Sequence, residues 1–123
     1  MQHINRNSVL RLQFDPQYND STPAAICDGQ YLWVGQLLPW ALPERRIPSG
    51  IRPQAKQLWQ NLQQLLRQVQ PAQLLQVTVT VADERLLSAA QGLFCDLAGA
   101  AGPVFCWRIG RFGDALLSLD AVA

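Results

Sequence analysis

The second half of the chain constrains the fold most, because residues 52–110 alternate between helical and strand periodicity. After Pro53, and again after Asp83, apolar residues recur every three or four positions, which is the spacing of one buried helix face. Residues 75–81 alternate between apolar and polar side chains, and residues 104–109 form a second strand-like run. A strand, a helix and another strand in this order predict a parallel strand pair with a right-handed crossover.

The first part of the chain adds strands to this unit. Residues 8–14 alternate like a half-buried strand, and Asp28-Gly29 between two apolar runs predicts a β-hairpin with a tight turn. Residues 115–120 favour a short strand at the edge of the sheet. We therefore expect an α/β fold, with α+β possible. It is a two-layer sandwich in which a mixed sheet of roughly four to six strands packs two helices on one face, in β-β-β-α-β-α-β order.

A length of 123 residues favours a single domain over residues 1–123. Within it, four prolines punctuate residues 39–53, and this spacing predicts an extended Pro-rich arm because proline cannot donate to a helix or an inner strand. The three cysteines form neither a closed disulfide framework nor a zinc-site spacing, so we expect no metal and no cofactor. Without an apolar leader or a bilayer-length apolar run, we expect a cytoplasmic protein with no membrane span.

Polar side chains lie along one face of the predicted sheet. Gln76, Thr78 and Thr80 alternate with valines, whereas a strand buried on both faces would be continuously apolar. We therefore expect helices to cover one side of the sheet, with Cys106 and Arg108 on the open side. The residues expected on the helix side of the last strand are Phe105, Trp107 and Ile109.

Arginines supply all the basic side chains except Lys56, and several could contact an anion or a nucleic acid. These candidates are Arg11, Arg45, Arg46, Arg52, Arg108 and Arg111. The 108–114 loop follows a parallel strand, where ligands gather in open α/β sheets, which suggests an anion- or nucleotide-binding module. The alternative is an ordinary turn closed by an Arg–Asp surface pair. A mildly basic sheet face and arm suggest a nucleic-acid-binding accessory domain, although a net charge of +1 is low for that class and a solvated face is the alternative.

The back of the second predicted helix carries a line of small residues: Ser88, Gly92, Cys95 and Gly99. Glycine inside a helix costs about 1 kcal/mol relative to alanine, so Gly92 suggests a packing reason. We predict that this line is an interface for self-association or for a protein partner. The alternative is packing against the chain's own Pro-rich arm or tail. Trp40, in the arm, is a second predicted contact residue.

Catalytic residues are not evident in the sequence. The single histidine, His3, lies near the chain start, and no carboxylate pair shares a face, so we predict that the chain is not an enzyme. Charged residues make up 15% of the chain, which protects a surface poorly against association. The function predicted from the sequence is thus a non-catalytic interaction or assembly protein, either a homodimer or a small subunit of a larger complex.

Overall fold

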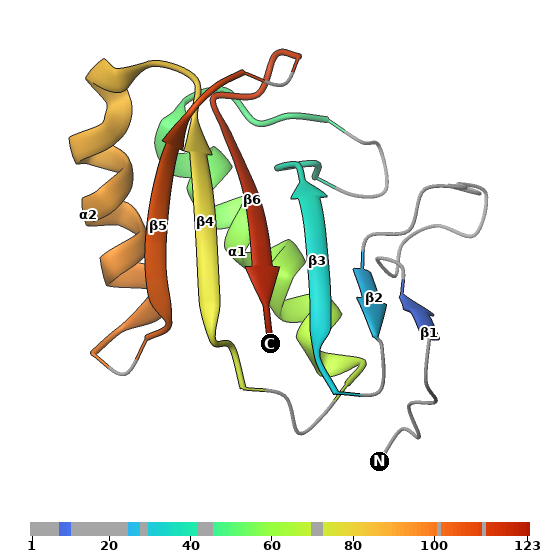
Figure 1. Cartoon of the computed structure of the whole chain (residues 1–123). Helices are drawn as coiled ribbons and strands as arrows, with labels where there is room; N and C mark the ends of the chain where they lie inside the picture. Colours follow the sequence, from blue (N-terminus) through green and yellow to red (C-terminus); the bar gives the residue numbers. More distant parts are fainter. Residues whose placement is uncertain are drawn as a thin grey trace.

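A six-stranded mixed sheet with two helices on one face forms the molecule (Figure 1). The computed structural model describes residues 8–10, 25–27, 30–41, 46–69, 73–100, 102–111 and 113–123. The elements are β1 (Ser8–Leu10), β2 (Ala25–Cys27), β3 (Leu32–Leu37), α1 (Ile51–Arg67), β4 (Gln76–Val81), the 3-10 helix η1 (Glu84–Leu86), α2 (Leu87–Ala98), β5 (Val104–Ile109) and β6 (Leu117–Val122). The predicted mixed sheet with two helices on one face is confirmed, and the predicted β-β-β-α-β-α-β order is found with one further strand, β6, at its end.

The strands lie in the order β1-β2-β3-β6-β4-β5. β4 and β5 are parallel and are joined through η1 and α2, as predicted, whereas β6 is antiparallel to both of its neighbours, β3 and β4. The prediction that the tail adds an edge strand is wrong, because β6 lies in the middle of the sheet (Figure 1). Leu117, Leu119 and Ala121 are buried under the helices, which explains why this strand needs neighbours on both sides.

The predicted N-terminal hairpin is formed by β2 and β3, which pair antiparallel. Cys27 pairs with Leu32, so residues 28–31 connect the strands and the predicted two-residue turn at Asp28-Gly29 is too short. These two residues lie outside the described part of the chain, as do Arg11 and the rest of the predicted 8–14 strand after Leu10.

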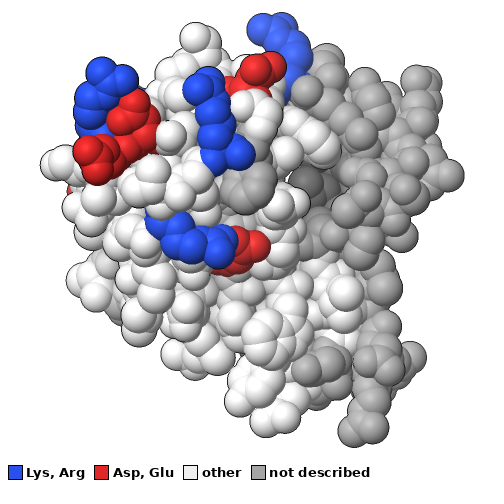
Figure 2. Space-filling model, turned by 45° about the horizontal axis from the view of Figure 1, so that its top comes forward, with Lys and Arg blue, Asp and Glu red and all other residues white. Residues whose placement is uncertain are grey.

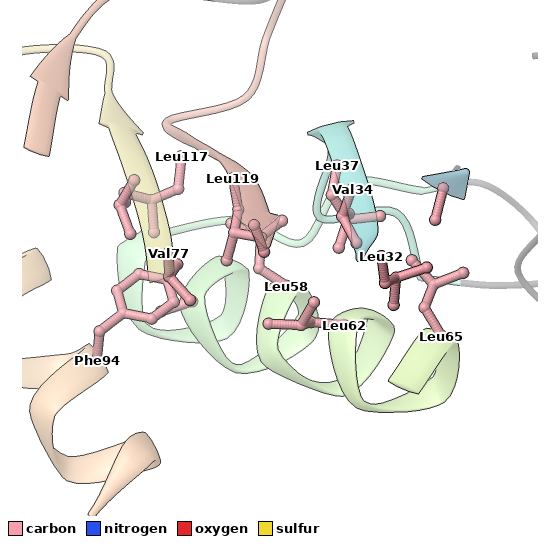
Figure 3. Close-up of a cluster of buried hydrophobic side chains, with 14 of the residues drawn as sticks. Leu32, Val34, Leu37, Leu58, Leu62, Leu65, Val77, Phe94, Leu117 and Leu119 are labelled. Atoms are coloured by element: carbon pink, nitrogen blue, oxygen red, sulfur yellow. The ribbon is translucent and has the colours of Figure 1, made fainter. Parts of the chain in front are cut away.

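The core lies between the sheet and α1 (Figure 3). Leu58, Leu62 and Leu65 of α1 are fully buried, as the stripe predicted, and they face β6 and β3, including Leu119, Leu32 and Val34. Fully burying one leucine side chain contributes about 2 kcal/mol. Phe94 of α2 extends the core to the edge of the sheet, because its ring contacts Trp107 at a centroid distance of 6.2 Å.

The Pro-rich arm leads directly into α1. The helix begins at Ile51 rather than at Pro53, and so takes in the end of the predicted 39–53 arm. Proline is tolerated in the first turn because its missing N–H would have no helical partner there. Two buried amides on α1 hold the arm: Asn61 Nδ2 donates to the Leu38 and Trp40 carbonyls at 3.2 and 3.0 Å, and Gln54 Nε2 donates to the Pro48 carbonyl at 2.9 Å. These bonds give partners to the carbonyls of Trp40 and Pro48 in the arm and of Leu38 just before it.

Candidate functional site

The face of the sheet away from the helices is open and carries the polar side chains of three strands. The valines of β4 are buried toward the helices, so Gln76, Thr78 and Thr80 lie on the opposite face, as predicted. Strand register places Asp120 beside Thr78 on β6, and Arg108 beside Thr80 on β5. Ile109, predicted to face the core, is on the helix side but is 54% exposed.

A hollow of about 290 Å³ lies on this open face between β3, β6 and β4. Its lining residues are Trp33, Val34, Gly35, Gln76, Thr78, Asp120, Ala121 and Val122. Gly35 leaves this space open because it has no side chain. The nearest atom to a Cβ placed at Gly35 would be Asp120 Oδ1, 4.0 Å away, so a side chain here would extend into the hollow. Among the described residues, Asp120 is the charged side chain in the lining.

A β-bulge in β3 shapes the hollow and holds Asp120. Val34 pairs with Ala121 and Leu37 with Leu119, so β3 carries one extra residue between these pairs. Gln36 absorbs it with a φ of 47°, a left-handed conformation that is uncommon for a residue other than glycine. The Gln36 N–H donates to Asp120 Oδ1 at 2.8 Å, which replaces a ladder bond with a bond to the carboxylate. Backbone strain of this kind concentrates at functional sites.

Arg108 reaches the same carboxylate from β5. Its Nη2 donates to Asp120 Oδ2 at 2.7 Å, and because β4 lies between β5 and β6, the arginine side chain spans β4 to make this ion pair. The side chains of Arg108 and Asp120 are 57% and 35% exposed. Beside this pair, Gln76 Nε2 donates weakly to Cys106 Sγ at 3.6 Å. The site thus combines a fixed carboxylate, an exposed guanidinium and a small hollow.

Of the predicted anion contacts that the structure describes, Arg108 is the one that belongs to this site. Arg108 pairs with Asp120, not with Asp114 as a simple turn would require. Arg111 is exposed and its Nε donates to the Gly113 carbonyl at 3.3 Å, while Arg52 and Arg46 are exposed at the start of α1 and in the arm. Arg11 and Arg45 lie outside the described residues. The described arginines are therefore not gathered into one cluster.

At the carboxyl end of β4, the charged side chains Asp83 and Arg85 bond each other. Asp83 caps η1 by accepting from the Arg85 backbone N–H at 2.9 Å. The Arg85 side chain pairs with the same carboxylate, with Nη2 at 2.7 Å from Oδ2. These hydrogen bonds, the side-chain one first, lower the pKa of Asp83 from 3.8 to about 2. Asp83 and Arg85 therefore neutralise each other's charge while Asp83 caps η1.

The predicted interface residues are elsewhere on the surface. Ser88, Gly92 and Cys95 on α2 and Gly99 at its C-cap are all exposed, and a Cβ at Gly92 would meet nothing within 4 Å. Within the described chain, nothing packs on Gly92, so the alternative of packing against the protein's own arm is not seen there. Trp40 is half-buried, and its carbonyl accepts from Asn61. The interface assignment stays a prediction.

Sequence reasoning missed Asp120, Gly35 and Gln36. Asp120 was part of a supposed edge strand, although the alternation in residues 117–122 already places it opposite the leucines. Trp33, which the sequence did not mark as a site residue, is 49% exposed on the open face. No signal in the sequence marks the bulge, because it depends on pairing with a distant strand.

Comparison with solved structures identifies the class of fold. The chain is similar to a putative endoribonuclease L-PSP from Entamoeba histolytica (TM-score 0.84, 16% identity, covering 96% of this chain and 98% of that one). It is also similar to YyfA of Yersinia pestis, a protein of unknown function in the conserved Rid family (TM-score 0.82, 18% identity, 95% and 98% covered). A third similar structure is Escherichia coli TdcF with bound serine (TM-score 0.79, 17% identity, 94% and 97% covered). No protein-family model and no curated protein matches the sequence. These similarities show a shared fold.

The comparison corrects the function predicted from the sequence. The prediction of a non-catalytic interaction or assembly protein is wrong, because the similar structures are described as an L-PSP endoribonuclease, Rid proteins, Mmf1 and serine-bound TdcF rather than as assembly factors. In Figure 2, basic and acidic side chains of the described residues lie in small mixed groups separated by uncharged surface, not in a basic patch.

The remaining expectations concern a membrane span and a metal site in the described residues. No helix in these ranges is long and apolar enough to cross a membrane. No group of three or more histidine, cysteine, aspartate or glutamate side chains in the same ranges could hold a metal ion. The prediction that the chain is not an enzyme stays a prediction, as does the absence of a cofactor.

Proposed function

We propose that this protein binds a small polar molecule in the hollow between β3, β6 and β4. The observation that carries the proposal is Asp120, a partly exposed carboxylate held in the lining by the N–H of a backbone bulge. Ligand pockets combine mostly apolar walls with a few placed polar groups, and here Trp33 and Val122 supply the apolar part. The serine described in TdcF, which shares the fold, supports a ligand of similar size.

The size of the hollow limits the ligand. About 290 Å³ is at the lower end of the range for ligand pockets, so the site suits a molecule of few heavy atoms and not a nucleotide or a peptide. The bulge also argues for binding, because a residue with positive φ costs roughly 1–3 kcal/mol and persists only where the surrounding structure requires it.

The test is a nuclear magnetic resonance titration with a library of small polar metabolites. A ligand is expected to shift the backbone amides of Trp33, Gly35, Thr78 and Val122. Gly35→Leu fills the hollow and is expected to abolish these shifts, whereas the matched control Gly92→Leu adds the same side chain to open space on α2. If no compound shifts these amides, or if Gly35→Leu binds like the wild type, the proposal is wrong.

We also propose that the protein self-associates through the open sheet face. Val104 is 67% exposed, and Ile26 and Trp33, which are register partners, are 44% and 49% exposed on the same face. Exposed apolar side chains gathered on one face mark interaction surfaces.

Sedimentation velocity is expected to show a species larger than the 13.7 kDa chain, and Val104→Arg is expected to dissociate it. Ile109→Arg is the control, because Ile109 is exposed on the helix side of the same strand; a wild-type monomer at every concentration would refute this proposal.

A cytoplasmic location remains part of the proposal. Cys27, Cys95 and Cys106 are all free thiols, which is the usual state of cysteines in a reducing compartment. When host cells are fractionated, we expect to detect the protein in the cytoplasmic fraction.

A further inference from the structure

We draw no further inference here: the strongest candidate, the outer edge of strand β5 with its exposed Val104 and Ile109 side chains, carries nothing, because nothing in the described part of the structure shows what covers it.

Discussion

At the scale of single residues, Thr80 carries an unused hydroxyl. It lies on the open face of β4 yet is 4% exposed, and its Oγ1 has no hydrogen-bond partner among the described residues. Gly110 covers it so closely that a Cβ there would approach Thr80 Cγ2 to 3.2 Å. A buried hydroxyl without a partner is a cost to folding.

Thr80→Val keeps the shape of the side chain and removes the unpaired hydroxyl. We expect the free energy of unfolding to rise by about 1 kcal/mol, because the desolvation cost of the hydroxyl is gone. Urea unfolding measures this, with Thr78→Val as the control, since the Thr78 hydroxyl is in the hollow and is only half-buried. A loss of stability in Thr80→Val would show that the hydroxyl has a partner after all.

The carboxylate of Asp83 provides a second prediction at this scale. Its pKa is about 2 instead of 3.8, because the Arg85 side chain and then the Arg85 backbone N–H donate to it. The lowered pKa means that the ionised form favours the folded state above pH 3.8, and that this contribution is lost as the pH falls from 3.8 toward 2.

In Arg85→Ala the side-chain bonds disappear and the backbone N–H remains. We expect the Asp83 pKa to rise toward 3.8 without reaching it, and the acid-sensitive part of stability to shift to higher pH accordingly. A carbon-detected titration of the Asp83 carboxyl measures the change. A pKa that stays near 2 in the variant would mean that the backbone N–H alone holds the carboxylate.

At the scale of elements, α1 acts as an anchor for the arm as well as a core helix. Asn61 is 4% exposed and bonds two arm carbonyls, while its Oδ1 accepts from Gln57 Nε2 at 2.9 Å. Asn61→Ala is expected to lower the free energy of unfolding by about 2–3 kcal/mol, because two carbonyls lose their partner. Gln57→Ala, which removes the partly exposed bond alone, is expected to cost less than about 1 kcal/mol; equal losses in urea unfolding would show that the arm bonds contribute nothing.

The exposed line on α2 gives a prediction that separates two readings. A Cβ at Gly92 meets nothing within 4 Å, so Gly92→Ala is expected to raise the free energy of unfolding by about 1 kcal/mol through helix propensity. Gly99→Ala is the control and is expected to destabilise, because Gly99 has a φ of +77°. If Gly92→Ala instead reduces both stability and the sedimenting mass, the line of small residues is the interface predicted from the sequence.

The elements that the sequence predicted well are those whose pattern is local. The helical stripes of α1 and α2 and the strand patterns of β4 and β5 can each be recognised within the segment itself. The bounds predicted for β5 are the observed ones. The role of Asn61 could not be predicted, because its partners are backbone carbonyls. Every residue has a backbone carbonyl, so the sequence does not show which ones Asn61 contacts. The candidate site could not be predicted for a related reason: Gln36 and Asp120 are 84 positions apart, and their bond depends on which strand pairs with β3.

At the scale of the whole molecule, β6 joins the two halves of the sheet. It pairs with β3 on one side and with β4 on the other, and Leu117 and Leu119 are 1% and 0% exposed. Without it, β1-β2-β3 and β4-β5 would share no ladder.

A chain that stops after Leu116 is therefore expected not to fold, since it loses both ladders and the apolar side chains that cover α1. Circular dichroism during urea unfolding would show no cooperative transition. The double variant Ser118→Ala and Val122→Thr keeps the strand and is the control. A cooperative transition in the shortened chain would mean that the two halves fold independently.

The central place of β6 also sets an order of events in the cell. A ribosome makes β6 after every other strand of the sheet, so the earlier strands leave the exit tunnel with unpaired inner edges on β3 and β4. Exposed edges of this kind favour wrong pairing between nascent chains. Native closure of the sheet must therefore await the synthesis of residues 117–122, whatever the earlier strands have formed by then.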